Sequence, residues 1–310
     1  FVAERLSLSA TNMFIDSFIG YLRVERNYSP QTLRAYANDL RSFQEYLARI
    51  DESLTFSSVD IDVVRMWMAA MVDDGATPST VSRKISALRT FYKFLCSRGH
   101  VPVNPLSSQL QSPKRRKKLP HFVKEQDMNS LLDGDTFGND YAGVRDRMIL
   151  LCFYSTGMRL TELVELDLAA IDMASSTIRV FGKRSRERII PFGYEMKQEF
   201  DSYLHARQAV ADMGCDALFL SANGTRRVSR SAVYRMVNSR LADVTSLGKR
   251  SPHVLRHSFA TAMLNNNAEL GAVKELLGHR RLATTEIYTH LTFEELKRFY
   301  NKAHPRAGNN

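Results

Sequence analysis

The sequence predicts a mainly α-helical chain of two units: a four-helix N-terminal unit and a mostly helical C-terminal unit with a small antiparallel β-sheet. Three observations lead to this prediction. Apolar residues recur with helical spacing throughout residues 12–100. A basic stretch with prolines near both ends follows at residues 113–121. Beyond it, two short segments alternate apolar and polar residues, which is typical of strands.

The composition indicates an ordinary globular chain. Its 310 residues are 44% hydrophobic and 25% charged, and this length suffices for two domains with a core each. The longest apolar run, residues 148–154, is far shorter than the roughly 20 residues that cross a bilayer, and no charged-then-apolar leader opens the chain. We therefore expect neither a membrane protein nor a secreted one. Three distant cysteines without a Cys-x-x-Cys pair favour a reducing cytoplasm over disulfides or a thiolate metal site.

The net charge of +10 favours a polyanionic partner. Half of this charge lies in residues 113–121, which contain five basic residues and no acidic one. The prolines and the preceding polar run predict an extended linker there, between domains at residues 1–112 and 122–310. A charge run of this kind can simply be solvated. The alternative is a strap along DNA phosphates, with Lys114, Arg115 and Arg116 as contacts.

Four amphipathic helices account for the N-terminal unit. Ser29-Pro30 and Thr77-Pro78 each offer a capping hydroxyl followed by a proline in the first helical turn. Gly75 and Gly99 lie just beyond helix ends, where glycine is common. The four apolar stripes are Phe14, Phe18 and Leu22; Leu33, Tyr36, Leu40, Phe43 and Leu47; Val63, Trp67, Ala70 and Met71; and Val81, Ile85, Leu88, Tyr92 and Leu95.

The C-terminal unit opens with helices and then changes period. An apolar helix is expected at about residues 144–155. Residues 177–181 and 188–192 alternate like strands and enclose the basic segment 182–186, which predicts a β-hairpin with a cationic tip. Helices resume at about residues 194, 229, 251 and 269, and a last helix at about residues 293–302 carries Leu296, Phe299 and Tyr300.

Two sets of residues are candidates for DNA contacts. Thr80, Arg83 and Lys84 lie beside the apolar stripe of the fourth helix, and their hydroxyl and cationic groups suit phosphate oxygens and base edges. Arg226 and Arg227 precede a helix start and could hold phosphates. In both places an ordinary solvated face is the alternative.

A helix start at Ser251-Pro252 places His253, Arg256 and His257 on one face of the first turns. The imidazole of His253 and the guanidinium of Arg256 thereby point in the same direction. Taken alone, this pattern is more typical of a structural histidine beside a surface ion pair, and we interpret His257 as a packing or hydrogen-bonding residue.

Two further segments contain residue types that are common in active sites. Arg159 follows a glycine break at Gly157 and begins a helix, with Glu162 one turn further on. Glycine also closes a later helix and delivers His279, which Tyr288 follows nine residues on. Each of these features is weak by itself.

Together these positions resemble the tyrosine recombinase (phage integrase) family, and most closely its bacterial Xer recombinases. The four-helix unit resembles the family's SAM-like core-binding domain, and Asn104-Pro105 and the ending at residues 304–307 look Xer-like. One departure is the hairpin tip, Gly-Lys-Arg-Ser-Arg, where many relatives have Gly-Lys-Gly-x-Lys. The six matching positions, in order, are Arg159, Lys183, His253, Arg256, His279 and Tyr288.

The resemblance implies that Tyr288 attacks a DNA phosphodiester and forms a 3′-phosphotyrosine intermediate. The other implied roles are a base (His253), two phosphate clamps (Arg159 and Arg256), a proton donor to the leaving oxygen (Lys183) and a hydrogen-bond donor (His279). Glu162 is interpreted as an acceptor that orients an active-site group. No cofactor or metal is expected, because the sequence has no P-loop, Rossmann glycine pattern or carboxylate cluster.

The implied partner is double-stranded DNA at a specific recombination site, bound by a homo- or hetero-tetramer on two sites that passes through a Holliday junction. A second Xer-type recombinase and a cell-division DNA translocase are implied for chromosome dimer resolution. The last helix would dock on a neighbouring protomer, or alternatively pack on its own unit. Other functions left open are a mobile-element integrase or DNA invertase, a type IB topoisomerase and a non-catalytic DNA-binding protein.

Overall fold

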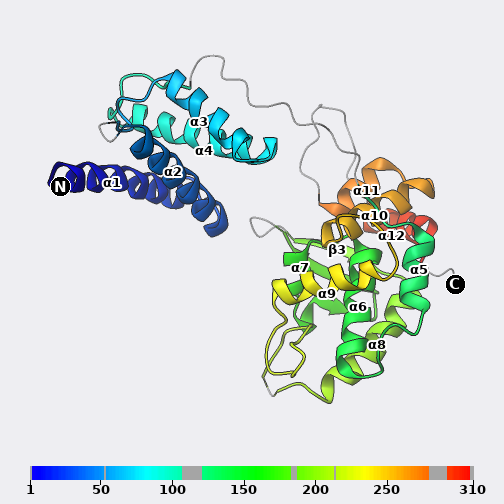
Figure 1. Cartoon of the computed structure of the whole chain (residues 1–310). Helices are drawn as coiled ribbons and strands as arrows, with labels where there is room; N and C mark the ends of the chain where they lie inside the picture. Colours follow the sequence, from blue (N-terminus) through cyan, green and yellow to red (C-terminus); the bar gives the residue numbers. More distant parts are fainter. Residues whose placement is uncertain are drawn as a thin grey trace. The chain divides into compact units, whose positions relative to one another are not determined.

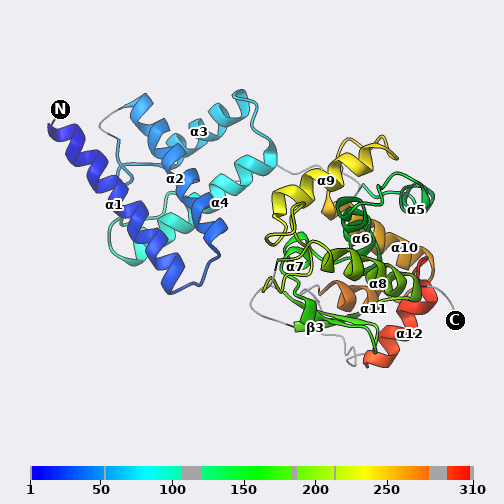
Figure 2. The same cartoon turned by 90° about the horizontal axis from the view of Figure 1, so that it is seen from below.

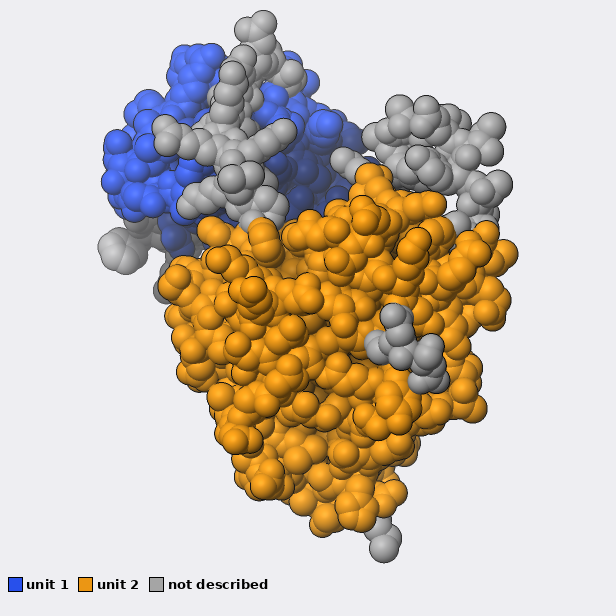
Figure 3. Space-filling model, turned by 90° about the vertical axis from the view of Figure 1, so that its right-hand side faces the viewer, with its two compact units in different colours: residues 1–118 blue, residues 119–310 orange. Residues whose placement is uncertain are grey.

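The structure, a computed structural model, describes residues 2–51, 54–106, 121–182, 187–212, 214–278 and 292–307, with side chains from residue 12 onward. The chain forms two units, residues 1–118 and 119–310 (Figure 3), which are described separately. The division falls within the stretch expected to be a linker. Nearly all of that stretch, including Lys114, Arg115 and Arg116, lies outside the described residues.

Unit 1 contains the four expected helices (Figure 1). Helix α4 contacts the other three, and aromatic side chains such as Phe18, Phe43 and Phe91 fill the core between them. The predicted caps are present, since the hydroxyls of Ser29 and Thr77 accept hydrogen bonds from the third residue of their helices. The helices are α1 (Val2–Val24), α2 (Pro30–Ile50), α3 (Ile61–Asp73) and α4 (Pro78–Ser97).

Unit 2 is mostly helical. Its other helices are arranged around helix α6, which contacts α8 and α10 (Figures 1 and 2). Every residue of α6 from Met148 to Thr156 is buried, which explains its continuous apolar run. Among the described residues, every helix is too short or too polar to cross a membrane. The helices are α5 (Glu125–Asp133), α6 (Tyr141–Thr156), α7 (Leu160–Val164), α8 (Tyr194–Gln208), α9 (Arg230–Ala242), α10 (Pro252–Asn265), α11 (Leu270–Leu277) and α12 (Phe293–Ala303).

The expected hairpin is present and forms part of a three-stranded antiparallel sheet in the order β1 (Ile171–Asp172), β2 (Thr177–Phe181) and β3 (Glu187–Pro191). In its register, Arg188 lies opposite Val180, which is fully buried. Residues directly opposite each other in a sheet share a face. The side chain of Arg188 therefore points to the inside of unit 2, and only 14% of it is exposed.

The last helix corrects one expectation. Leu296 and Tyr300 of α12 are buried in the core of unit 2, and Phe299 packs against the same core. The apolar stripe is therefore covered by the chain's own α10, α11 and β3 rather than left for a neighbouring protomer.

The segment after α12 is held in the same core. The backbone N–H of Arg306 donates to Nδ1 of His304, so Nε2 carries the ring proton and donates to the carbonyl of Tyr154 at 3.1 Å. Burial lowers the pKa of His304 to about 4, which keeps the ring neutral. The guanidinium of Arg306 binds both carboxylate oxygens of Asp133 at 2.7 Å and also contacts Glu195. The end of α12 is thereby fixed to α5, α6 and α8.

Candidate active site

The site begins where α6 ends. Gly157 caps α6 in the left-handed conformation, at a φ of 59°. A Cβ atom at this position would lie 2.5 Å from Cδ1 of Phe259 and 2.7 Å from Cδ2 of Leu277. Only glycine fits both the backbone angle and the space. The chain can therefore pass close to α10 and α11 before it begins α7.

Glu162, the third residue of α7, accepts hydrogen bonds from Arg159 at the N-cap of this helix. The backbone N–H of Arg159 donates to Oε2 of Glu162 at 2.8 Å, and its Nη1 donates to Oε1 at 2.7 Å. Its Nη2 donates to the carbonyl of Gly278 at 3.3 Å. A guanidinium has five N–H donors, so three remain, and the side chain is 37% exposed. Arg159 is thus oriented by its neighbours and still open to a ligand.

Arg188 approaches the same carboxylate from β3. Its Nη1 and Nη2 donate to Oε1 and Oε2 of Glu162, both at 2.9 Å, in a two-point contact. Its Nε donates to the carbonyl of Leu276 at 3.0 Å. Arg188 is not among the residues predicted from the sequence, although it makes three hydrogen bonds here, as many as Arg159.

Arg256 lies on α10 and is only 7% exposed. Its Nη1 donates to the carbonyl of Gly157 and its Nη2 to that of Leu277, both at 2.6 Å. It therefore joins the end of α6 to the end of α11. We refer to Arg159, Glu162, Arg188 and Arg256 as the arginine cluster.

The electrostatics of the arginine cluster favour an anion. Burial works against the charge of Glu162, but hydrogen bonds from Arg188 and Arg159 outweigh it and hold its pKa at about 2. Burial and the nearby charge of Arg159 lower the pKa of Arg256 to about 10, so it stays charged at neutral pH. Three guanidinium groups thus face one carboxylate, which leaves a surplus of positive charge.

His253 and His257 lie on α10 beside Arg256, and both are exposed, whereas Arg256 is buried. Partial burial of its ring and the charge of Arg256 lower the pKa of His253, which favours its neutral form and leaves a ring nitrogen free to accept a proton. The expected cap differs in one detail. Ser251 is at the N-cap of α10, but its hydroxyl makes no capping hydrogen bond and is buried instead.

Three predicted site residues, Lys183, His279 and Tyr288, lie outside the described residues. What precedes His279 is described: Gly278 ends α11 in the left-handed conformation, at a φ of 63°, and its carbonyl accepts from Arg159.

The predicted DNA contacts on α4 also make contacts within unit 1. Arg83 forms an ion pair with Asp39 of α2, a carboxylate that is 4% exposed. Lys84 donates to the hydroxyl of Ser42 at 2.8 Å. The backbone N–H of Thr80 donates to the hydroxyl of Thr77, which caps the start of α4. Arg83 is nevertheless exposed, while Thr80 and Lys84 are half-buried.

Arg226 and Arg227 differ although they are neighbours. Nη1 of Arg227 donates to the carbonyls of Val164 and Leu166 at 2.8 and 2.9 Å, and its Nη2 pairs with Asp167. Arg226 is more exposed. Arg227 therefore tethers the chain after α7, whereas the side chain of Arg226 extends toward solvent.

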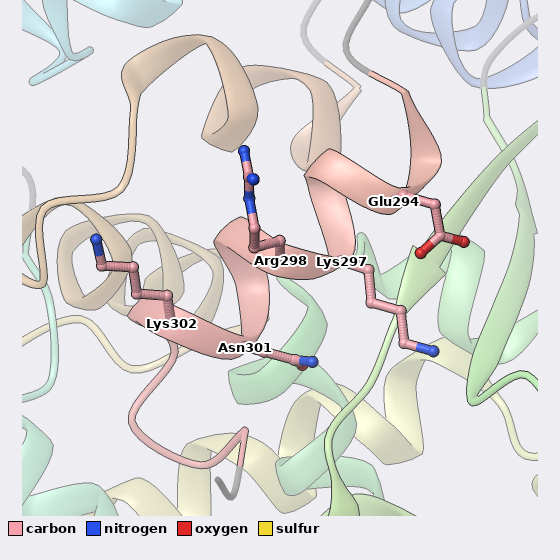
Figure 4. A pocket seen from close by; sticks show the side chains of 5 residues that line it. All are labelled: Glu294, Lys297, Arg298, Asn301 and Lys302. Atoms are coloured by element: carbon pink, nitrogen blue, oxygen red, sulfur yellow. The ribbon is translucent and has the colours of Figure 1, made fainter. Parts of the chain in front are cut away.

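A shallow hollow of about 500 Å³ lies elsewhere, along the exposed face of α12 (Figure 4). The side chains that line it fan out from successive turns of this helix rather than converging on a point (Figure 4). No group of three or more histidine, cysteine, aspartate or glutamate residues within the described ranges could hold a metal ion. The residues lining the hollow are Glu294, Lys297, Arg298, Asn301 and Lys302.

Residues 121–295 match the Phage integrase family, and residues 15–99 match the phage integrase N-terminal SAM-like domain. Tyrosine recombinase XerC of Pelotomaculum thermopropionicum is 40% identical over 304 residues, which is 94% of this chain and 98% of the relative.

Two solved structures share the fold. XerH site-specific recombinase bound to palindromic difH substrate has a TM-score of 0.70 at 19% identity and covers 90% of this chain and 78% of that one. A lambda integrase dimer bound to a COC′ core site has a TM-score of 0.68 at 15% identity and covers 91% of this chain and 99% of that one.

Proposed function

Because the chain belongs to the phage integrase family of tyrosine recombinases, we propose that the arginine cluster is the phosphate-binding part of its active site. The protein is a site-specific recombinase of the Xer type, which cuts DNA strands and rejoins them. One observation supports the assignment of the site above all. Arg159, Arg188 and Arg256 gather around the single carboxylate of Glu162, and their surplus positive charge suits a phosphodiester.

The cleavage step is an attack of the phenolic oxygen of Tyr288 on the scissile phosphorus. A bond from this oxygen to phosphorus forms and the bond from phosphorus to the 5′ oxygen breaks, which leaves a 3′-phosphotyrosine and a free 5′-hydroxyl. Lys183 protonates the leaving oxygen, and His279 donates a hydrogen bond to the phosphoryl group. The phosphotyrosine ester keeps the energy of the broken phosphodiester bond. Religation can therefore proceed as the reverse attack, by a 5′-hydroxyl on the phosphorus.

The phenol needs assistance because tyrosine has an ordinary pKa of about 10. We assign the base to His253. Its pKa is lowered by partial burial and by the charge of Arg256, which favours the neutral ring that can take the phenolic proton.

The two clamps act from different positions. Arg159 is part-exposed and keeps three donors for the non-bridging oxygens, while Glu162 fixes its orientation. Arg256 is buried, and its two contacts to backbone carbonyls hold it in place before DNA binds. Preorganised donors of this kind stabilise charge that grows in the transition state.

DNA binding itself is assigned to both units. We propose that residues 1–112 and 122–310 act as DNA-binding and catalytic domains joined by the basic linker, with Thr80, Arg83, Lys84, Lys114, Arg115 and Arg116 near phosphates.

Two neighbouring arginines allow this assignment to be tested. We expect Arg226→Gln to weaken DNA binding and to lower the slope of log affinity against log salt by about 1, because one phosphate contact is lost. Arg227→Gln should instead lower the free energy of unfolding by about 1–3 kcal/mol, because it leaves carbonyls of the segment after α7 without their donor. Binding titrations at several salt concentrations and urea unfolding separate the two effects. An equal slope of log affinity against log salt in wild type and Arg226→Gln would contradict the contact between Arg226 and a DNA phosphate.

The partners and the setting follow from the Xer-type assignment. We propose a tetramer on two DNA sites, a second Xer-type recombinase and a cell-division DNA translocase as partners. A cytoplasmic location is supported by the bacterial chromosome as substrate and by the three cysteines, which are all free. Identity to a XerC over nearly the whole chain supports chromosome dimer resolution over a mobile-element integrase, since the phage integrase is similar at the level of fold.

The proposed chemistry is tested with a suicide DNA substrate that is nicked near the recombination site and labelled at its 5′ end. Incubated in EDTA and run on a denaturing gel, wild-type protein should shift the labelled strand into a covalent band, because a 3′-phosphotyrosine keeps the 5′ label. Cleavage that stops in EDTA, or a band that forms only with a 3′ label, would contradict it.

A further inference from the structure

We propose that Arg188 is a positioning residue, which holds Arg159, the strand after Lys183 and the helix end before His279 in one arrangement for DNA cleavage. The inference rests on the proposed function, since it assigns Arg188 to the same active site. Arg188 would not touch the DNA and would act through Glu162 and the backbone.

The fold directs Arg188 to this place. It belongs to β3, five residues after Lys183 in the sequence, and points inward because it lies opposite the buried Val180. The neighbouring Ile190, on the same face, is fully buried. A charged side chain on a core-facing position requires partners, and Arg188 has them on two other elements.

The first partner is Glu162 of α7. Arg188 donates to both oxygens of this carboxylate at 2.9 Å, whereas the side chain of Arg159 donates to Oε1 alone, at 2.7 Å. The negative charge of Glu162 is thus balanced largely by Arg188. Without Arg188, the buried carboxylate would rely on Arg159 alone and would compete with the phosphate for it. The cluster would also lose one of its three positive charges.

The second partner is the end of α11. Nε of Arg188 donates to the carbonyl of Leu276 at 3.0 Å, and a Cβ at Gly278 would lie 3.3 Å from Cδ and Nη1 of Arg188. The side chain therefore packs against the last turn of α11 and the glycine that precedes His279. One guanidinium thus fixes three segments, and each segment contains or adjoins a residue to which we assign chemistry.

A matched control lies on the same hairpin. Arg179 of β2 is 59% exposed and pairs with Glu187 at 3.3 Å. Replacing Arg179 by glutamine removes the same charge from the same sheet as replacing Arg188. The side chain of Arg179, however, faces away from the arginine cluster.

The test measures single-turnover cleavage of the suicide substrate by wild type, Arg188→Gln, Arg188→Lys and Arg179→Gln. The rate constant reports the arrangement of the site, whereas the amplitude reports the fraction of folded, active protein. For Arg188→Gln we expect a rate constant lower by about 10- to 100-fold with DNA affinity within about twofold of wild type. Arg188→Lys should recover part of the rate, because an ammonium keeps the charge but cannot bridge both partners. Arg179→Gln should cleave at the wild-type rate.

Two outcomes would overturn the inference. One is an Arg188→Gln rate constant within about twofold of wild type, with or without a smaller amplitude, because a merely structural residue changes only the amplitude. The other is a parallel loss of affinity and rate, which would make Arg188 a DNA contact. If Arg188→Gln does not fold, the rate constant and the DNA affinity of Arg188→Lys are judged by the same two criteria. Failure of the proposed function is distinct, since wild type itself would then form no covalent complex.

Discussion

Tyr288→Phe is expected to form no covalent complex with DNA while it binds DNA with wild-type affinity. The substitution removes only the phenolic oxygen, which is the atom that attacks phosphorus in the proposed reaction. The aromatic ring is kept, and the arginine cluster is untouched, so phosphate binding should persist. The measurement compares covalent bands from the suicide substrate on a denaturing gel in EDTA, together with a binding titration on uncleaved DNA.

Tyr300 provides the control for this prediction. It lies twelve residues later in α12, is fully buried in the core of unit 2, and burial raises the pKa of its phenol. Its hydroxyl has no access to DNA, so Tyr300→Phe should still form the covalent complex. A covalent band from Tyr288→Phe, or its loss in Tyr300→Phe but not in Tyr288→Phe, would assign the nucleophile to another residue.

The parts of the fold that could be predicted are those set by local sequence. Ser29-Pro30 and Thr77-Pro78 begin helices because the cap and the proline act within one turn. The alternation of residues 177–181 and 188–192 predicts β2 and, to within one residue at each end, β3 for the same reason. An amphipathic stripe, however, predicts only that a face is buried and not against what. The stripe of α12 therefore left open whether it covers its own unit or a neighbour.

The contacts of the arginine cluster could not be predicted, because they join distant parts of the chain. Arg188 and Glu162 are 26 positions apart, Arg256 and Gly157 are 99 apart, and Arg159 and Gly278 are 119 apart. Their meeting depends on how α10, α11 and β3 pack. One signal for Arg188 was present, since alternation along β3 places it on the same face as Ile190. An arginine on a face that should be apolar indicates a buried partner.

The same long-range packing explains the difference between the two clamps. Arg159 is held by Glu162, three residues later in the same turn, and so can be found from a local pattern. Arg256 is held by the carbonyls of Gly157 and Leu277, which end two other helices. Its burial makes it part of the framework of unit 2 as well as of the proposed site, so its removal should affect both.

Arg256→Gln is accordingly expected to lower the single-turnover cleavage rate by about 10³-fold or more, because a preorganised cationic donor to the phosphoryl oxygens is lost. It should also lower the free energy of unfolding, by about 1–3 kcal/mol for each backbone carbonyl that keeps no donor. Arg256→Lys should be nearly as slow, since one ammonium cannot span two carbonyls and also grip a phosphate. Rates are measured well below the melting temperature of each variant, and stabilities by urea unfolding.

Arg207 separates the catalytic loss from the structural one. It is 5% exposed, compared with 7% for Arg256, and likewise donates to backbone carbonyls, those of Cys215, Ala217 and Leu218, none of which belongs to the arginine cluster. Arg207→Gln should therefore lose comparable stability while its folded fraction cleaves at the wild-type rate. If both variants lost cleavage equally, or if Arg256→Gln cleaved within about tenfold of wild type, the buried charge of Arg256 would serve only the fold. The clamp on the phosphate would then fall to Arg159 alone.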